Sequence, residues 1–421
     1  MAQVIPSTKP VINSDRLQKD LIELARIGRN ETNHGLYRMA FTEADMEAKD
    51  WLRKRLEEAG LPSKMDGAGN VWSRIEGKEQ GPALLIGSHL DTVPCAGTLD
   101  GSLGVLAGLE CLRVIKENGW QPGHPVELVA FSDEEGRFGG MLGSQALCGQ
   151  VHPEVLHAKD LNGTSLSDAM KERGLDPMGV LEAQRPASAF KAYLELHIEQ
   201  GPVLHKKGIP LGVVEEITGL FKWSVVLKGE ANHAGTTPMD MRRDAFMGLA
   251  DFAHELPRIL AENGTDRSKA TIGKAEILPG AANTVAGWVE FSLDVRDTSP
   301  ETLQELHESC RRALSAIARR RELMFEFSVL SRIEPVQCDD SIVDILSQSA
   351  EKLGLEHLRM PSGAAHDAQI MASLVPVGMV FVPSRDGVSH SPAEWTAWDD
   401  IFAGAGLMLE AAKRISRIED E

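Results

Sequence analysis

Residues 87–101, with the sequence GSHLDTVPCAGTLDG, decide how this chain is expected to fold. They follow a short apolar run at residues 83–86 that is typical of a buried strand, and they precede a segment at 102–118 whose apolar residues have helical spacing. His89 is therefore expected where a strand ends, and Asp100 just before a helix begins. Because ligands bind outside the carboxyl ends of the strands in open α/β sheets, these side chains should stand at a binding edge.

The residue types in this stretch are those of a metal site. His89 offers an imidazole nitrogen, and Asp100 can use both carboxylate oxygens as ligands. Asp91 can hold the ring of His89, as the partners of metal-binding histidines do. The spacing of these three residues therefore predicts metal binding.

Other polar groups stand at the ends of strands that are predicted separately. The strand-like runs at residues 126–131 and 193–198 end in such groups, and the polar segment 384–392 contains a further histidine. Taken singly, a glutamate pair is usually solvated and a histidine at a strand end is usually structural. Their coincidence favours a site for two ions with Asp100 as a bridge. The side chains concerned are Glu134, Glu135, His197 and His390.

Composition and charge limit the classes of protein to be considered. The chain has 421 residues, of which 42% are apolar and 25% charged, enough for two globular domains. A net charge of -18 opposes binding to nucleic acid or to an anionic membrane. No apolar run is long enough to span a membrane, and the first residues lack the apolar core of a secretion signal. The five scattered cysteines, without CxxC spacing, predict reduced thiols and a cytoplasmic location.

A change of pattern after about residue 211 predicts an inserted domain. Alternating strands and helices predict an α/β domain made of residues 1–211 and 332–421. Residues 212–331 instead combine amphipathic, antiparallel strands with two helices, which indicates an α+β unit with one open sheet face. Its strands are expected at 223–227, 289–295 and 325–330, and its helices at 249–256 and 303–317.

An ordered set of motifs runs along most of the chain, from about residue 30 to about residue 410. In order, the motifs are HLDTVP…LDG, DEEG, ELHIEQGPVL, NHAGTTPM, AANTV, DVRD, SGAAHDA and SHSPAEW. Together they resemble the hydantoinase/carbamoylase amidases, within the clan of dinuclear zinc aminoacylases and carboxypeptidases. That family includes N-carbamoyl-L-amino acid hydrolases, β-ureidopropionases, allantoate amidohydrolases and ureidoglycolate amidohydrolases.

The resemblance implies a zinc-peptidase-like catalytic domain, whose mixed sheet is flanked by helices. It also implies an inserted lid and dimerisation domain with a four-stranded antiparallel sheet and two helices. The metal centre would hold two divalent ions per subunit, zinc first, with manganese, cobalt or nickel as alternatives. By resemblance, His89 and His197 bind one ion, Glu135 and His390 bind the other, and Asp100 bridges them.

The resemblance makes Glu134 the general base. Neighbouring residues of an extended chain point in opposite directions, so Glu134 is expected to stay clear of the metals if Glu135 binds one. It would then be available to take a proton from the attacking water and deliver it to the leaving nitrogen.

Several polar residues are candidates for substrate binding. Arg296 could hold a carboxylate through two parallel hydrogen bonds, although it could equally form an ion pair with Asp294 on an exposed sheet face. Asn283 could bind the same carboxylate, and His233 could act catalytically by stabilising a developing oxyanion. Both could also be plain turn residues. In the catalytic domain, the candidates are Gln200 and His366.

The leading hypothesis is an N-carbamoyl-L-amino acid hydrolase that releases the amino acid, ammonia and carbon dioxide. Allantoate amidohydrolase, ureidoglycolate amidohydrolase and β-ureidopropionase are the alternatives on the same scaffold. A non-catalytic binding protein is the alternative from another class, but the chain retains both the base and the ligands. The expected partners are a small ureido substrate that carries a carboxylate, and a second copy bound through the lid.

Overall fold

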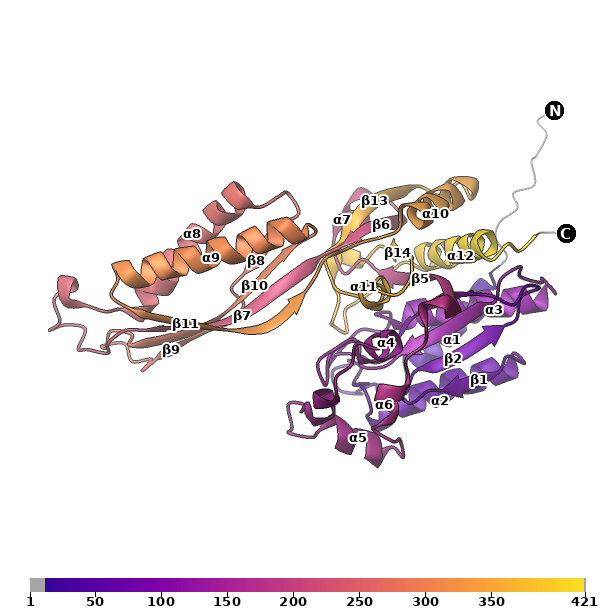
Figure 1. The fold of residues 1–421 in the computed structure, drawn as a ribbon, viewed down its shortest axis with the longest axis horizontal. Coiled ribbons are helices and arrows are strands. Elements are labelled where there is room, and N and C mark those ends of the chain that lie inside the picture. The colour runs from indigo at the N-terminus through magenta and orange to yellow at the C-terminus, as the bar shows by residue number, and fades with distance from the viewer. Residues whose placement is uncertain (1–11, 420–421) are drawn as a thin grey trace. The chain divides into compact units, whose positions relative to one another are not determined.

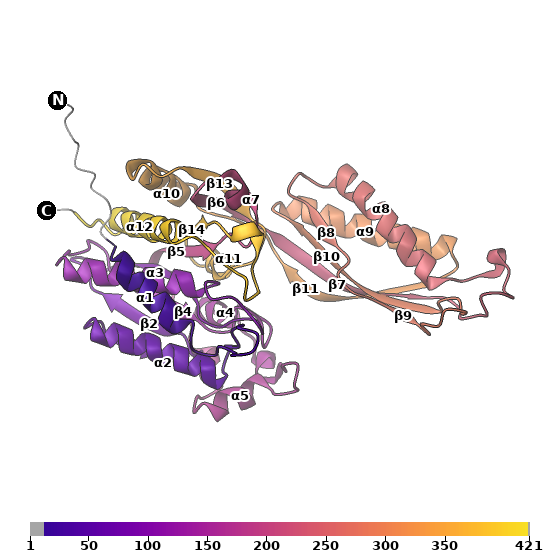
Figure 2. The same ribbon diagram turned by 180° about the vertical axis from the view of Figure 1, so that it is seen from behind.

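The computed structural model describes residues 12–419, and the chain divides into two units. The main unit contains the chain up to Glu215 and from Cys338 onward, and the inserted unit is Glu216–Gln337. The boundaries predicted from the sequence are 211/212 and 331/332. The inserted unit is the part coloured pink to orange in Figure 1, and Figure 2 shows both units from behind.

The main unit is built on a nine-stranded mixed sheet of order β1-β2-β4-β3-β5-β14-β6-β12, with β13 also paired to β6. β3 runs parallel to β4 and β5, and β14 runs parallel to β5. The outer pairs, such as β2 with β4 and β14 with β6, are antiparallel. The strands are β1 (Ser63–Met65), β2 (Val71–Ile75), β3 (Ala83–His89), β4 (Val126–Phe131), β5 (Phe190–Ile198), β6 (Leu211–Ile217), β12 (Val336–Gln337), β13 (His357–Ser362) and β14 (Val377–Val382).

The central strands are buried because their residues are almost all apolar. Every residue of β3, β4 and β14 is buried, which is typical of strands covered on both faces by helices. The longer helices that pack against this sheet or against one another are α1 (Ser14–Leu24), α2 (Glu43–Glu58), α3 (Ser102–Glu117), α10 (Asp340–Lys352) and α12 (Trp398–Ile415). The predicted class, a mixed sheet flanked by helices, is confirmed.

Residues 137–189, for which the sequence analysis makes no assignment, fold around a small apolar core of their own. Phe41, Phe138 and Leu166 are among its buried side chains. The short elements of this region are α4 (Leu142–Cys148), η1 (Pro153–His157), α5 (Leu166–Glu172), α6 (Gly179–Glu182) and η2 (Ala187–Ala189). Elements this short carry too few residues to show a periodic pattern.

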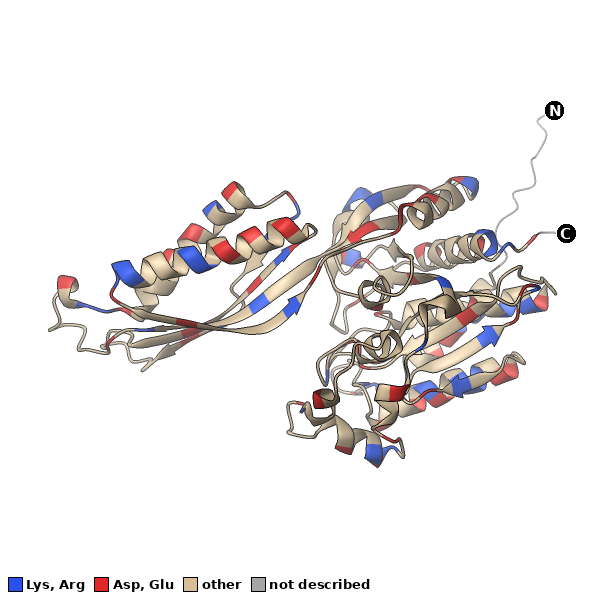
Figure 3. Cartoon of the chain, viewed as in Figure 1, with Lys and Arg blue, Asp and Glu red and all other residues tan. Residues whose placement is uncertain are grey.

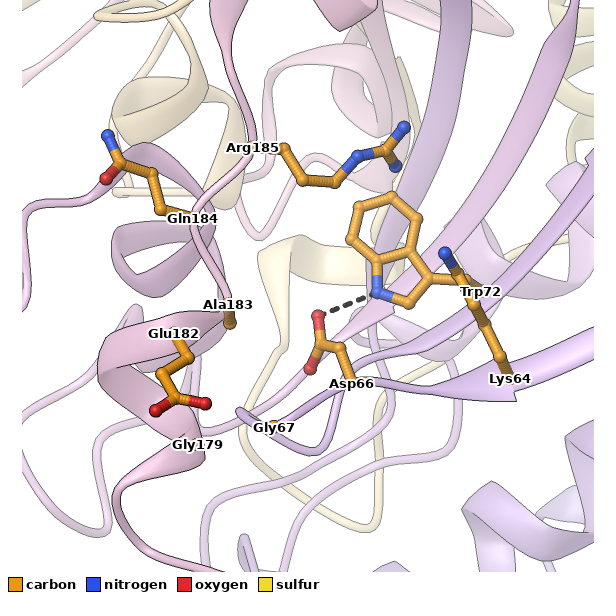
Figure 4. Close-up of a pocket in the computed structure, with 9 residues that line it drawn as sticks. All are labelled: Lys64, Asp66, Gly67, Trp72, Gly179, Glu182, Ala183, Gln184 and Arg185. Atoms are coloured by element: carbon orange, nitrogen blue, oxygen red, sulfur yellow. Dashed lines mark hydrogen bonds between the residues drawn. The ribbon is translucent and has the colours of Figure 1, made fainter.

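A surface pocket of about 310 Å³ lies between α6 and the turn that joins β1 to β2 (Figure 4). In it, Trp72 Nε1 donates a hydrogen bond of 2.8 Å to Asp66, and the guanidinium of Arg185 lies 4.9 Å from the centre of the Trp72 ring. The lining residues include none of the candidate metal ligands. This pocket is therefore separate from the site predicted from the sequence.

The inserted unit is an antiparallel sheet with two helices on one face. Its strands are β7 (Gly219–Lys228), β8 (Lys269–Thr271), β9 (Ala275–Leu278), β10 (Trp288–Asp297) and β11 (Met324–Ile333), and its helices are α8 (Ala245–Asn263) and α9 (Pro300–Arg320), with the short turn η3 (Met239–Met241). Alternate residues of β7, such as Trp223 and Val225, are buried beneath the helices. The opposite face carries polar residues, as the alternation of the sequence predicts.

The sheet of the inserted unit has five strands rather than the four implied by the resemblance. Its order is β11-β7-β10-β8, and β9 also pairs with β10. β8 pairs with residues 294–296 and β9 with residues 288–291, so both lie along the same edge of β10. The extra strand therefore arises because this edge position is divided into two short pieces.

The two ends of the insertion lie beside each other. β6 leads out of the main unit and β12 leads back, and the two strands pair antiparallel, with Ile217 opposite Val336 and Glu216 opposite Gln337. Charged residues of both signs are mixed along the helices of both units (Figure 3). In α9, for example, Arg311 pairs with Glu308 and Arg312 with Glu305. Among residues 12–419, no helix is both long enough and apolar enough to cross a membrane.

Candidate metal centre

Five predicted ligands meet at one edge of the main sheet. His89 is the last residue of β3, His197 lies near the end of β5, and Glu135 follows β4. Asp100 comes directly before Gly101, the N-cap of α3, and His390 lies in the loop after β14. Since β3, β4, β5 and β14 run parallel, their carboxyl ends share an edge, and that edge gathers the five residues.

Asp100 lies between two groups of ligands. Its Oδ1 is 3.1 Å from His197 Nε2 and 3.7 Å from His89 Nε2. Its Oδ2 is 3.3 Å from His390 Nε2, which in turn is 3.5 Å from Glu135 Oε2. One oxygen of Asp100 thus faces each group, which is the arrangement that a bridging carboxylate requires.

A glycine makes room for this arrangement. Gly101 has a φ of 62°, and a Cβ atom at this position would lie 2.3 Å from the ring of His89. Any other residue would be strained in its backbone and would displace a ligand. The Asp100-Gly101 pair is therefore required by space as well as by chemistry.

Backbone oxygens fix the orientation of two imidazoles. His89 Nδ1 lies 3.0 Å from the carbonyl oxygen of Asp91, and His197 Nδ1 lies 2.9 Å from that of Ile198. In each ring, a proton on Nδ1 leaves the lone pair of Nε2 directed at the carboxylates. This is the tautomer that binds a metal ion.

Asp91 supports the site through both its main chain and its side chain. The ring of His89 is held by the main-chain oxygen of Asp91 and not by its carboxylate. The carboxylate instead accepts hydrogen bonds from the backbone N–H groups of Glu134, at 3.3 Å, and Glu135, at 3.1 Å. A short Asp side chain two residues beyond a strand end can reach the neighbouring loop more easily than it can turn back to the ring.

The cluster has a strong affinity for positive charge. His89 and His197 are 1% exposed and Asp100 is 3% exposed, and within residues 12–419 no lysine or arginine forms an ion pair with Asp100, Glu134 or Glu135. Although burial acts to lower the pKa of His197, Asp100 raises it to about 9. Buried carboxylates without a cation are costly, so nitrogen and oxygen donors arranged in this way fit divalent ions such as zinc.

Glu134 points into the cluster and not away from it. Its Oε2 lies 3.6 Å from His89 Nε2, and both Glu134 and Glu135 offer an oxygen within 4.8 Å of the His89 ligand atom. The expected opposite directions do not occur, because the pair follows Asp133, which has a φ of 56°, in a turn and not in an extended strand. Burial, and then the charge of Glu135, raise the pKa of Glu134 well above its usual value. The Glu134 carboxyl group thus lies within reach of the centre.

The structure brings Gln200 and His366 to the same edge. Gln200 Nε2 donates to Asp100 Oδ2 at 2.7 Å and lies 3.4 Å from His390 Nε2. The ring of His366, at the start of α11 (Asp367–Met371), has its centre 4.5 Å from that of His197. Burial, and then His197, lower the pKa of His366 well below its usual value.

The three candidates in the inserted unit fall into two places. Residues 233 and 284 form an isolated β-bridge, and Ala234 N donates to the carbonyl oxygen of Asn283 at 2.8 Å, so His233 and Asn283 are neighbours. Arg296 lies near the other end of β10, with Nε 2.9 Å from Asp294 Oδ1 and Nη2 3.3 Å from Oδ2. The ion pair offered as an alternative for Arg296 is thus present.

Two buried carboxylates beside the ligands are not among the residues predicted from the sequence. Glu195 accepts hydrogen bonds from Ser88 Oγ, at 2.7 Å, and from the Ala368 backbone, at 3.0 Å. Glu394 accepts one of 2.8 Å from the Leu99 backbone. A charge within an apolar strand could have signalled Glu195, because such charges are rare without partners. Glu394 lies in a polar turn and gives no such signal.

The whole chain is similar to known amidohydrolases. Residues 85–414 match the model of peptidase family M20/M25/M40. An N-carbamoyl-L-amino acid amidohydrolase of Geobacillus stearothermophilus is 39% identical over 413 residues, covering 97% of this chain and 100% of that protein. An allantoate amidohydrolase of Escherichia coli (strain K12) is 36% identical over 383 residues, covering 89% and 92%. The crystal structure of an amidase of the hydantoinase/carbamoylase family from Burkholderia multivorans has a TM-score of 0.88 and 33% identity, covering 98% and 99%.

Proposed function

Because this chain belongs to peptidase family M20/M25/M40, and within it to the hydantoinase/carbamoylase amidases, we propose that it hydrolyses N-carbamoyl-L-amino acids. The chain is an amidohydrolase that acts on C–N bonds of linear amides. We propose that the bond cleaved is the C–N bond of the carbamoyl group, and that the products are the L-amino acid, ammonia and carbon dioxide. The observation that carries it is Asp100, which faces one set of ligands with each oxygen while Glu134 lies beside them.

Each group of the centre has a distinct part in this proposal. His89 and His197 would hold one divalent ion, Glu135 and His390 the other, and Asp100 both. When bound, the two ions would supply Lewis acidity for the carbonyl and lower the pKa of water. Zinc suits the donor set, with manganese, cobalt or nickel as alternatives. Glu134 would accept the proton of the attacking water and pass it to the leaving nitrogen.

The substrate would be held by polar groups from both units. Gln200 and His366 are proposed to contact the ureido group, because both lie among the ligands. We propose Arg296 and Asn283 for the substrate carboxylate, and His233 for the developing oxyanion. Arg296 would then exchange its bonds to Asp294 for bonds to the substrate, which is possible because the two pairings have the same bidentate geometry.

The positions of these residues within the inserted unit support a homodimer. Arg296 lies eight residues beyond Trp288 on β10, whereas His233 and Asn283 lie in loops beyond the Trp288 end. At about 3.4 Å per residue, the two places are roughly 27 Å apart, more than the length of a small substrate. If both contact one substrate, a second copy of the chain must supply one of them. We therefore propose a homodimer formed through the inserted unit.

Two further parts of the proposal concern location and partners. We propose a cytoplasmic enzyme, supported by the five cysteines, none of which forms a disulfide within residues 12–419. A net charge of -18 supports a small-molecule substrate and neither nucleic acid nor membrane as partner.

A substrate panel tests the proposal. Purified enzyme is incubated with N-carbamoyl-L-amino acids, N-carbamoyl-β-alanine, allantoate and ureidoglycolate, and ammonia release is measured. We expect the highest kcat/KM for an N-carbamoyl-L-amino acid. Allantoate is the second candidate, because an allantoate amidohydrolase is 36% identical over most of both chains. Turnover of allantoate alone would reject the first choice.

A further inference from the structure

Glu394 connects two loops that are remote in the sequence. It follows His390 by four residues and is 5% exposed. Its Oε1 accepts hydrogen bonds from the backbone N–H groups of Leu99, at 2.8 Å, and Asp100, at 3.2 Å. The carboxylate of one loop is therefore bound to the main chain of the residue that lies between the two ligand groups.

Ser389 completes this connection. Its Oγ lies 3.2 Å from Glu394 Oε2 and 3.0 Å from Asp100 Oδ2. The hydroxyl therefore lies between the two carboxylates and next to His390. Backbone and side chain of Asp100 are both bound to the loop that carries His390.

The Glu394 side chain fits against Gly97 because glycine has no Cβ atom. A Cβ atom at Gly97 would lie 2.4 Å from Glu394 Cβ and 2.3 Å from Glu394 Oε1. This glycine does not have a positive φ, so close approach and not backbone conformation requires it. The loop before Asp100 and the Glu394 side chain are thus packed in direct contact.

We propose that Glu394 is a positioning residue of the metal centre, which fixes Asp100 relative to His390. The inference rests on the proposed function, since it concerns the same ions. Without Glu394, the N–H groups of Leu99 and Asp100 would be buried without partners, which is unfavourable enough to move the loop. Residues that orient metal ligands typically change metal affinity about 10–100-fold when they are removed.

The test compares the metal affinity of three variants with that of the wild type. Zinc dissociation constants are measured by competition with a chromophoric chelator, and the absorption spectrum of the cobalt-loaded protein reports ligand geometry. We expect Glu394→Ala to raise a zinc dissociation constant about 10–100-fold and to alter the cobalt spectrum. Glu394→Gln should stay close to wild type, because its amide oxygen can accept from Leu99 and Asp100 while its NH2 donates to Ser389.

Glu410→Ala is the matched control. Glu410, on α12, is another buried carboxylate of the main unit. It accepts a hydrogen bond of 2.6 Å from Lys352 Nζ. Its removal should lower the melting temperature and leave zinc affinity unchanged. If Glu394→Ala does not fold, Ser389→Ala tests the same connection and should also raise the zinc dissociation constant.

The outcomes separate this inference from the proposed function. A wild-type protein that binds no stoichiometric metal while active overturns both. The positioning role alone is overturned if the wild type binds two ions and the zinc affinity of Glu394→Ala stays within twofold of the wild-type value. The same criterion applies to Ser389→Ala where that variant is used. An affinity loss in Glu410→Ala equal to that in Glu394→Ala would also overturn it, because general destabilisation would then explain the effect.

Discussion

The binding edge of the main unit and the polar sheet face of the inserted unit differ in how they hold their polar side chains. At the edge, His89, Asp100 and His197 are buried, Glu135 is half-buried and His390 is exposed, and backbone groups orient the rings of His89 and His197. On the sheet face, Arg296 is part-exposed and paired with a neighbour on its own strand, Asp294. Ligands for an ion must be held in fixed positions, whereas groups that receive a changing substrate can remain solvated. Under the proposed function, the edge would supply the chemistry and the face would supply substrate affinity.

Metal removal should have the largest effect on activity. Treatment with a chelator is expected to reduce ammonia release to background, because the carboxylates and imidazoles of the edge alone cannot polarise the substrate carbonyl. Zinc, manganese or cobalt should restore it. Full activity in protein shown by elemental analysis to be metal-free would contradict the role given to the edge.

Glu134→Gln should have the next largest effect. The amide keeps the size of the side chain but cannot accept a proton, so kcat is expected to fall about 10²–10⁴-fold. Metal content should remain at the wild-type level, since Glu134 is not a proposed ligand. Kinetics and elemental analysis on the same sample check both statements, and a fully active variant would exclude Glu134 as the base.

Arg296→Ala tests the proposed role of the sheet face in substrate binding. Loss of a charge-assisted pair is worth about 1.5–3 kcal/mol, so KM for carboxylate-bearing substrates should rise about 10–100-fold with a smaller change in kcat. Lys222→Ala removes another cation that lies 3.5 Å from Asp294 and serves as the control. Unchanged KM and kcat in Arg296→Ala would leave the Asp294 ion pair as the whole role of this residue.

The smallest effect is expected at a helix end of the inserted unit. The Ser299 side chain accepts a hydrogen bond from Thr302 N at the start of α9, and Ser299→Ala should cost about 1 kcal/mol of unfolding free energy. Denaturant titration measures this loss. Zinc affinity should not change, because the main unit holds all proposed ligands. A change in zinc affinity would show that the two regions are not independent.

The sequence places several residues of the binding edge next to elements with a strong local signal. The buried run before His89 and the helical spacing after Asp100 determine where these side chains stand. Local patterns could not reveal Glu394, whose partners Leu99 and Asp100 are almost 300 residues away. They also could not show that Asp91 binds the His89 ring through its main-chain oxygen while its carboxylate binds the backbone of Glu134 and Glu135, because this depends on tertiary geometry.

The secondary structure shows the same division. The helices α3, α8 and α9 have helical spacing and the strands β3 and β4 are apolar runs, and these elements occur where the sequence predicts them. The split edge of β8 and β9 and the short helices of residues 137–189 have no such period. Their conformation depends on packing against the rest of the fold, which outweighs local propensity.

The pairing of β6 with β12 gives the chain a modular architecture. Because the outgoing and returning strands are hydrogen-bonded neighbours at Ile217 and Val336, the gap between them is about 5 Å. A two-residue hairpin could close that gap, so residues 218–335 could be exchanged for a reverse turn without re-routing the large sheet. Such a junction lets evolution, or a protein engineer, gain, lose or swap the whole module in a single genetic event.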